Sequence, residues 1–492
     1  MKKIIAVLMA CLMLLGLLVG CTPTAPTENA TPESPATAPE SPASPDAPAE
    51  PAEAAPLTGK LVIWSFTNEL KTFATAFKEK NPGVEVEYTM VPMTNGEFQT
   101  KIQAAITSGE VPDAIALEAS FVKSYVESDF LMDLNDLLPI AKEMGTYQST
   151  IDVGTFDGVT KAFSYQATPG ALFYRRSLAK EYFGTDDPAQ MQTILSDMTK
   201  FTDAAKVVHD KSAGNTYMVC SPMDFAKIYY PNRAQPWDVD GKFVIDPSID
   251  ELFEVAKTFR QNGYEAQAVQ WQEGWFAGMN DSLVDANGNP KQVFCYFLPT
   301  WGLPYVLAPN AKPREADGVT TGKDTAGDWA CITGPMPYQW GGTWVGAMKD
   351  AANPELAKEF VKFVALNEET LKNWALGTYT NEYLKAIDPE VGDELAQAPG
   401  DFVSSQKVVE EIMPQFDSSE TSKFLNGQNA YNGFAQAAPA VSAKLMQGID
   451  DAVDRALVDV LTNYAAGNMT KEEAMQAFKD AVKNVLPDLI VE

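Results

Sequence analysis

The stretch LVIWSFTNELKTFATAFKEKNPGVEVEY, residues 61–88, decides the fold of this chain. It opens with an apolar, β-branched run that predicts a buried strand over 60–66. The next apolar residues have the i, i+3, i+4, i+7 spacing of an amphipathic helix: Leu70, Phe73, Ala74 and Phe77. Residues 81–83, Asn-Pro-Gly, would end that helix, and the alternation over 84–90 predicts a second strand. The segment is therefore expected to form a β-α-β unit.

The residues that follow continue this alternation of strands and helices. Ile102, Ala105 and Ile106 indicate another helix, which would end near Gly109, and residues 114–117 predict a third strand. Because strands separated by helices usually form a parallel sheet, we expect a parallel sheet covered by helices.

The C-terminal third of the chain is predicted to be mostly helical. Asn353-Pro354 is typical of a helix start, with Pro at the first helical position. Thr470 and Glu473 have the spacing of a capping box. Apolar stripes follow both starts, so these helices are expected to pack on a core.

The charge of the chain limits its partners. Its 492 residues include 37 Lys+Arg and 66 Asp+Glu, which gives a formal net charge of −29. Nucleic-acid binding needs a positive surface, so a protein this acidic is not expected to bind DNA or RNA. The length allows more than one domain, at roughly 100–200 residues each.

The N-terminus predicts secretion. Residues 1–3 are basic, and residues 4–19 are apolar or small, which is typical of a signal peptide over 1–20. The run ends in Leu-Val-Gly before Cys21, and this resembles the bacterial lipobox. The resemblance implies cleavage before Cys21, acylation of that cysteine, and a location outside the cytoplasm on the cell membrane.

Residues 22–57 change in composition. They hold ten Pro and ten Ala and no Lys or Arg, so they cannot bury enough apolar area to fold. We predict that residues 21–57, with the lipidated Cys21, form a disordered tether and that 58–492 form the folded body. No later stretch approaches ~20 apolar residues, so no membrane span is expected there.

The folded body resembles family 1 extracellular solute-binding proteins of ABC transporters, the group that includes maltodextrin-binding protein. The resemblance is carried by residues 61–88 and by KIQAAITSGEVPDAIALEASFVKSYVES at 101–128. AFSYQATPGALFYRRSL at 162–178 resembles the family's first segment that crosses between lobes. GGTWVGAMKDAANPELAKEFVKFVA at 341–365 resembles the return crossing and the helix after it.

This resemblance implies an α/β fold of the two-lobed, type II periplasmic-binding-protein class. Each lobe would be a mostly parallel sheet flanked by helices, joined to the other by hinge segments. One lobe would hold about 58–167 and 341–376, and the other about 173–335 and 377–492. The implied function is capture of a mono- or oligosaccharide and its delivery to an ABC importer permease by a monomer.

Candidate ligand residues follow the predicted strands, because ligands of open α/β sheets bind at the carboxyl ends of strands. Trp64 ends the first strand, and Asn68 and Glu69 come after it. Glu118 and Ser120 follow the third strand in the same way. By the resemblance, Asn68 and Glu69 fall where the family has polar sugar contacts.

Aromatic candidates come from later in the chain. Trp301, in YFLPTWGLP, matches the Trp that stacks on sugar in the maltodextrin branch. An indole covers the flat apolar face of a pyranose and leaves the hydroxyls free for polar side chains. Trp237, Trp271 and Trp344 are further candidates for a cleft wall, and Asp224 falls where a relative has a ligand-contacting acid.

Several other kinds of site are not expected. The single histidine, His209, lies at a predicted helix end that stops at Gly214, where a surface or capping residue is expected, so neither a Ser-His-Asp triad nor a His-rich metal site is expected. Residues 285–289 begin like a calcium loop, but Pro290 and Tyr296 stand where that loop needs Gly and Glu. We therefore predict no metal, no cofactor and no catalytic residue.

The cysteines of the folded body are Cys220, Cys295 and Cys331. They are too sparse for a disulfide scaffold or a zinc site. A single bridge, Cys295–Cys331 or one that includes Cys220, remains open from the sequence.

Three other functions remain open from the sequence. The ligand could be a polyamine or a peptide, with Glu69, Glu118 and Asp224 supplying carboxylates for a cation. A surface glycosidase would need two carboxylates about 5–10 Å apart, for which no motif is present. A surface scaffold protein would bind no small ligand.

Overall fold

The computed structural model describes residues 56–316, 318–392 and 400–492. Pro56–Glu492 form one compact unit. The predicted signal peptide, Cys21 and nearly all of the predicted tether lie outside the described residues. In the described ranges, no helix is both long and apolar enough to cross a membrane.

The first sheet has five strands in the order β2-β1-β3-β16-β6. Their bounds are Gly83–Met90, Thr58–Ser65, Ala114–Glu118, Thr343–Ala347 and Ala162–Ser164. β1 is parallel to β2 and β3, whereas β16 runs antiparallel to β3 and β6. The β-α-β-α-β prediction is confirmed, and β16 is the one reversed strand that returns from later in the chain.

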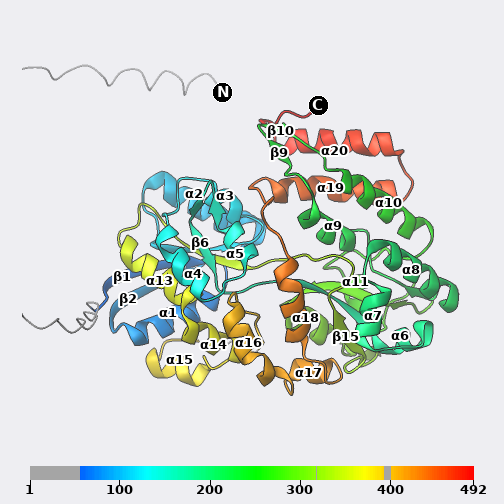
Figure 1. Cartoon of the computed structure of the whole chain (residues 1–492), viewed down its shortest axis with the longest axis horizontal. Helices are drawn as coiled ribbons and strands as arrows, with labels where there is room; N and C mark the ends of the chain where they lie inside the picture. Colours follow the sequence, from blue (N-terminus) through cyan, green and yellow to red (C-terminus); the bar gives the residue numbers. More distant parts are fainter. Residues whose placement is uncertain (1–55, 317, 393–399) are drawn as a thin grey trace, which may run out of the picture. The chain divides into compact units, whose positions relative to one another are not determined.

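Helices cover this sheet (Figure 1). They are α1 (Glu69–Lys80), α2 (Glu97–Ser108), α3 (Val122–Val126), α4 (Leu138–Glu143), α5 (Gln148–Val153), α13 (Pro354–Leu366) and α14 (Glu368–Leu376). The predicted apolar face of α1 is fully buried. α13 begins at the predicted Pro354, but the side-chain amide of Asn353 donates to the Lys60 carbonyl, so that side chain does not cap the helix.

The second sheet has the order β12-β7-β15, with bounds Cys295–Pro299, Gly170–Arg175 and Trp329–Ile332. β7 runs antiparallel to both neighbours, so it is the reversed strand of this lobe. A parallel pair lies beside it, β8 (Thr216–Tyr217) with β11 (Gln292–Val293).

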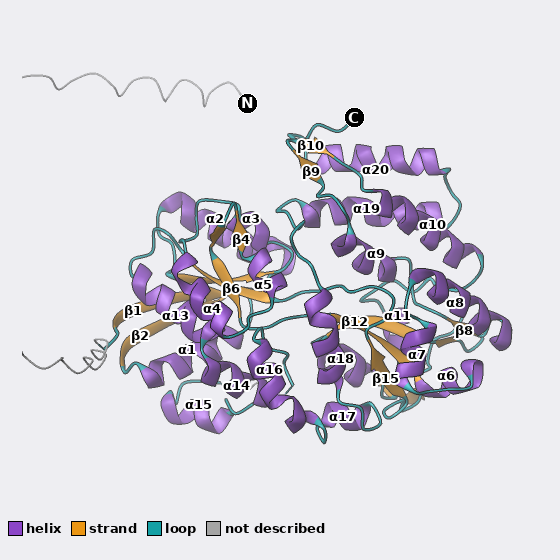
Figure 2. Ribbon diagram, in the orientation of Figure 1, coloured by secondary structure: helices purple, strands orange, loops and turns teal. Residues whose placement is uncertain are grey.

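The helices of the second lobe fall into two groups. Beside the sheet lie α6 (Arg176–Phe183), α7 (Pro188–Ile194), α8 (Met198–Ser212), α9 (Met223–Tyr229), α11 (Glu273–Ala277), α17 (Glu420–Phe424) and α18 (Ala430–Ala437). Farther out, α10 (Pro247–Gln261), α19 (Asp450–Ala465) and α20 (Lys471–Val485) form a helical layer (Figure 2). The predicted capping box of Thr470 and Glu473 is confirmed at the start of α20.

Two segments connect the sheets and pair with each other. Residues 165–169 lead from β6 to β7, and residues 333–342 lead from β15 back to β16. The Gly170 amide donates to the Tyr338 carbonyl (2.7 Å), and the Trp340 amide donates to the Thr168 carbonyl (3.2 Å). The first segment lies within the stretch 162–178, and the second ends at Gly341 and Gly342, where the stretch 341–365 begins; these are the two stretches that resemble the family's crossings.

Two later helices pack with the first lobe. α15 (Asn381–Ile387) contacts α1, and α16 (Gln406–Ile412) contacts α14. These two helices therefore differ from the expectation that all of 377–492 belongs to the second lobe. The exact boundaries of the two lobes stay a prediction.

The three cysteines of the described residues, Cys220, Cys295 and Cys331, are free thiols. Each is at most 1% exposed, and burial raises the pKa of each thiol, that of Cys331 to about 12. The disulfide left open by the sequence is therefore not formed.

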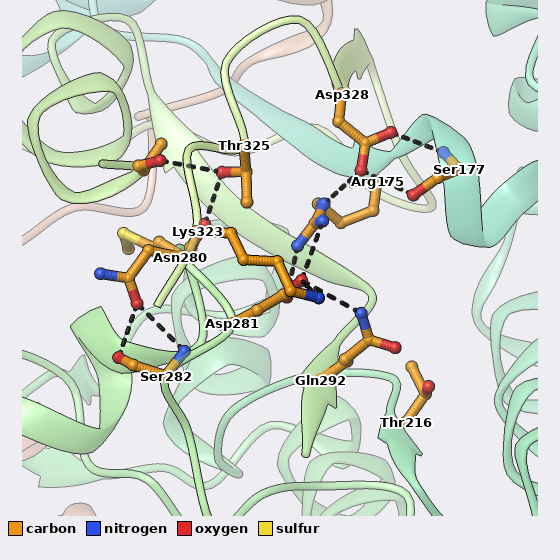
Figure 3. Close-up of polar contacts among 12 residues, drawn as sticks. Arg175, Ser177, Thr216, Asn280, Asp281, Ser282, Gln292, Lys323, Thr325 and Asp328 are labelled. Atoms are coloured by element: carbon orange, nitrogen blue, oxygen red, sulfur yellow. Dashed lines mark hydrogen bonds and ion pairs between the residues drawn. The ribbon is translucent and has the colours of Figure 1, made fainter. Parts of the chain in front are cut away.

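A buried ion network fixes one end of the second sheet (Figure 3). Arg175 on β7 contacts Asp281 (2.7 Å) and Asp328 (2.8 Å) through different guanidinium nitrogens. Gln292 donates to Asp281 (3.2 Å), and Asp328 also accepts the Ser177 hydroxyl (2.6 Å). Burial disfavours the charged form of Asp281, but Arg175 outweighs it and lowers the pKa of that carboxyl.

Candidate functional site

A pocket of about 280 Å³ is built from four segments far apart in the sequence. They are the turn after β3, the end of α9 with the residues beyond it, the returning crossing segment, and residues 442–454. Its lining comprises Glu118, Ala119, Ser120, Lys227, Tyr230, Pro231, Arg233, Gln339, Trp340, Gly341, Ser442, Ala443, Leu445, Met446, Gln447, Asp450, Asp451 and Asp454. The site thus includes groups from both lobes and from the segments between them.

Glu118 stands at the carboxyl end of β3, where the sheet rule placed a ligand contact. Its carboxylate accepts the Ser120 amide (2.8 Å) and the Ser120 hydroxyl (2.5 Å). Burial raises the pKa of Glu118. Of the ten ligand residues predicted, Glu118 and Ser120 are the two that line this pocket.

The second lobe contributes cations and a phenol. Arg233, 6% exposed, forms an ion pair with Asp450 (3.3 Å) and lies over the Trp237 ring (4.3 Å). The Lys227 ammonium lies 5.4 Å from the centre of the Trp340 ring. Both groups can donate hydrogen bonds to a ligand.

Two buried oxygens of the pocket have no hydrogen-bond partner among the described residues. They are Asp454 Oδ1 and the Tyr230 hydroxyl, and Tyr230 is 7% exposed. A buried polar group without a partner costs about 1–3 kcal/mol, so such groups point to an occupant. Burial is also the main cause that raises the pKa of Asp454 to about 8, and that of Asp450 to about 6.

The raised pKa of Asp454 predicts a pH dependence of stability. The carboxyl titrates near 4 when unfolded and near 8 when folded, so the folded state holds its proton more tightly. The stabilisation of the fold by this proton is fully present below about pH 4. That stabilisation is lost as the pH rises through 8. Unfolding of wild type and Asp454→Asn in urea at pH 5 and pH 8 should show wild type losing about 3–4 kcal/mol more than the variant.

The groups that face Asp454 are Lys227, Arg233, Tyr230 and two further acids of α19, Asp450 and Asp451. Asp459→Asn is the matched control, because Asp459 lies on the same helix and is exposed. Parallel pH profiles for wild type and Asp454→Asn would contradict a raised pKa at Asp454.

Three tryptophans stand together at the crossing segment. The indole of Trp301 donates to the Trp340 carbonyl (2.9 Å), and the two rings meet edge to face at 5.4 Å. Trp271, 51% exposed, is parallel to Trp301 at 6.2 Å. Trp340 lines the pocket, whereas Trp301 and Trp271 lie beside it as an extension of the aromatic surface.

Residues 441–449 close one side of the pocket and bind both lobes. The Gly448 amide donates to Glu127 of the first lobe (3.0 Å). The Gln447 side chain accepts from the Asp238 amide (2.8 Å) and donates to its carbonyl (2.9 Å). Gly448 is needed at this contact, since a Cβ there would lie 2.9 Å from Ser124 Cα.

The other predicted residues of the first lobe lie apart from this pocket. Trp64 is half-buried under the Lys101 ammonium (4.3 Å), and Asn68 immediately precedes α1. Glu69 accepts the hydroxyl of buried Tyr165; burial, together with nearby Asp401, raises its pKa to about 7.

Three further residues that the sequence suggested as ligand contacts are deeply buried. Trp237 and Trp344 are 0% and 1% exposed, and the indole of Trp344 donates to the Thr150 carbonyl (2.9 Å). Asp224 is 3% exposed and accepts the amides of Cys220 (3.1 Å) and Ser221 (2.9 Å), which lie just before α9. These contacts place all three in the core rather than at the pocket.

The sequence pattern did not single out Trp340, Lys227, Arg233, Asp450 or Asp454. A signal was present for Trp340, because it directly precedes the Gly341-Gly342 pair of the return crossing. In the described ranges, no group of His, Cys, Asp and Glu side chains is arranged to hold a metal ion.

Residues 72–394 match the family model described as bacterial extracellular solute-binding protein. The chain belongs to this family. As an extracellular solute-binding protein it is expected to work outside the cytoplasm, and its family consists of binding proteins rather than enzymes. A comparison of the sequence with curated proteins gives no match.

Solved structures show the same fold. An extracellular solute-binding protein of family 1 matches with a TM-score of 0.71 at 16% identity, over 87% of this chain and 99% of that one. An ABC-transporter-associated binding protein from B. animalis subsp. lactis Bl-04, in complex with β-1,6-galactobiose, matches with a TM-score of 0.58 at 18% identity, over 88% and 99%. The galacto-N-biose/lacto-N-biose I-binding protein of a Bifidobacterium longum ABC transporter matches with a TM-score of 0.61 at 13% identity, over 88% and 99%.

These matches confirm the two-lobed type II fold and the recognition of an extracellular solute-binding protein. The pocket of this solute-binding protein includes the carboxyl end of β3, as expected for an open α/β sheet. Its position between groups of both lobes suits a ligand that holds the lobes together.

Proposed function

We propose that this solute-binding protein captures a carbohydrate of one or two rings and delivers it to an ABC importer. The observation that carries the proposal is the pocket around Trp340, with polar groups from both lobes at its rim. Its volume of about 280 Å³ is near the lower end of ligand pockets, about 300–1,000 Å³. The sugar complexes of two structural neighbours support the same class of ligand.

The residues have distinct proposed roles. Trp340 covers one face of the sugar ring, as aromatic side chains do for pyranoses. Glu118, Lys227 and Arg233 bind ring hydroxyls by charge-assisted hydrogen bonds. Trp301 and Trp271 support Trp340 and offer a surface for a second ring.

We further propose that the protein acts as a monomer anchored by acyl chains on Cys21, with the tether reaching to residue 57. The support is the lipobox-like Leu-Val-Gly-Cys after an apolar run. Expression of Cys21→Ser should release the protein from the membrane fraction into the medium. Equal membrane retention of Cys21→Ser and wild type would count against the anchor.

Thermal unfolding of the chain from residue 22 onward, with a panel of mono- and disaccharides, tests the function. A ligand that binds only the native state at 100 times its dissociation constant stabilises it by about 2.7 kcal/mol. A rise of the midpoint with one group of sugars is expected. A rise with peptides but with no sugar would overturn the carbohydrate assignment.

The protein is proposed to release its ligand unchanged. Incubation with aryl glycosides should give no product that grows linearly with time. Steady product formation, abolished by Glu118→Gln, would favour the glycosidase alternative.

A further inference from the structure

The charge of the pocket carries information about the ligand beyond its being a sugar. Four carboxylates line it, from Glu118, Asp450, Asp451 and Asp454, against the two cations Lys227 and Arg233. This excess of acid is unusual for a site that is meant to hold a neutral ligand, because each buried carboxylate must be paired or hydrogen-bonded.

Three of these acids already have partners. Glu118 accepts two hydrogen bonds from Ser120, Asp450 pairs with Arg233, and Asp451 pairs with Arg455 one helical turn away. Asp454 differs from them, because its Oδ1 atom is buried and has no hydrogen-bond donor in the described part of the chain. Lys227 and Arg233 act on it only by Coulomb attraction.

We propose that the ligand is a sugar that carries a free, protonated amine, and that its ammonium binds between Asp454 Oδ1 and the Tyr230 hydroxyl. This inference rests on the proposed function, whose ligand class it narrows. An ammonium donates up to three hydrogen bonds, so one group can satisfy both buried oxygens. It also supplies a positive charge beside Asp454, which takes part in no ion pair among the described residues.

The cations of the pocket argue for an amino sugar over a polyamine. Lys227 and Arg233 would repel the second and third ammonium of a polyamine, whereas they can donate to hydroxyls. Gln339, Gln447 and Ser442 add neutral groups that suit hydroxyls as well. The Trp340 ring completes a site for a ligand with one charge, several hydroxyls and an apolar face.

The same geometry predicts that acetylation of the amine weakens binding. An N-acetyl group carries no charge and donates a single hydrogen bond, so it cannot compensate Asp454. The neutral parent sugar, with hydroxyl in place of amine, lacks the charge in the same way. Comparing the affinities of the amino sugar, its N-acetylated form and its neutral parent therefore separates the effect of ligand charge from that of ligand shape.

Isothermal titration of the chain from residue 22 onward at pH 6.5 tests the proposal. The probes are glucosamine, galactosamine, mannosamine and the disaccharide of two glucosamines, each with its N-acetylated and its neutral parent form, and spermidine. We expect one amino sugar to bind at least tenfold more tightly than its acetylated and parent forms. In Asp454→Asn this preference should fall below about threefold, while Asp459→Asn keeps it.

A second readout does not depend on a variant. Burial raises the pKa of Asp454 to about 8, so a bound ammonium should displace a proton from this carboxyl near pH 7. Titrations near pH 7 in buffers of different ionisation enthalpy should therefore show release of up to one proton with the amino sugar and none with the parent sugar.

Three outcomes would overturn the inference. Binding of neutral sugars with equal or greater affinity would do so while leaving the proposed function intact. If Asp454→Asn keeps the preference for the amine, the ammonium does not bind Asp454. Binding of spermidine alone, or of no probe, would overturn the inference and also count against the carbohydrate function.

Discussion

Replacing Trp340 by Ala should weaken ligand binding by about 30- to 700-fold, which corresponds to about 2–4 kcal/mol. The ring is the tryptophan of the pocket lining, and it also contacts Trp301 and Lys227. Its removal takes away the apolar face on which a sugar ring would rest. It also leaves Trp301 without its edge-to-face neighbour.

Phe156→Ala is the matched control, because Phe156 is an exposed aromatic (45%) on the short strand β4 (Thr155–Phe156), outside the pocket lining. Affinity is measured by isothermal titration with the sugar found in the thermal screen. Unfolding in urea checks that both variants are folded. Unchanged affinity in Trp340→Ala would place the ligand elsewhere.

Replacing Arg175 by Met should destabilise the protein by about 3–5 kcal/mol. The side chain is 5% exposed and stands between the carboxylates of Asp281 and Asp328 (Figure 3). Met keeps much of the volume but leaves two neighbouring carboxylates without their counter-charge. The free energy of unfolding in urea at pH 7 measures the effect.

Lys323→Met is the matched control for this network. Lys323 also approaches Asp281 (3.6 Å), but its side chain is 72% exposed, and exposed pairs contribute at most about 1 kcal/mol. The deficit of Arg175→Met should shrink at pH 5, because the unpaired carboxyls can then take up protons. A loss below about 1 kcal/mol for Arg175→Met would mean that water reaches the network.

The fold was predictable because its signals are local. The strand–helix–strand pattern of 61–88, the Pro354 helix start and the Thr470 capping box each depend on neighbours within a few residues. Stretches that cross between the lobes were expected from the resemblance, whereas the hydrogen bonds between the two connecting segments come from the structure alone. The sequence did not predict that α15 packs on α1 and α16 on α14. Such packing depends on contacts between segments, which no local sequence pattern encodes.

The pocket was harder to predict, since its groups come from residues as far apart as Glu118 and Asp454. The strand-end rule singled out Glu118 and Ser120, because a strand end is visible in the sequence; both line the pocket, and their contact with a ligand stays a prediction. Residue type alone does not distinguish a core ring from a binding wall at Trp237 and Trp344, since a large apolar ring serves both; the structure buries the two rings. In the sequence Asp454 is one more acid of a predicted helix, and its burial depends on Lys227, Tyr230 and Arg233, which come from a distant part of the chain.

The three buried cysteines make this protein suitable for a fluorescent sensor. A thiol reagent attacks the thiolate, and Cys220, Cys295 and Cys331 are both shielded and held as neutral thiols. A single new cysteine at an exposed position, such as Ser120 at the pocket rim, could therefore be labelled selectively without removing the native ones. A dye at that rim would report solute capture directly, in real time and without a radioactive ligand.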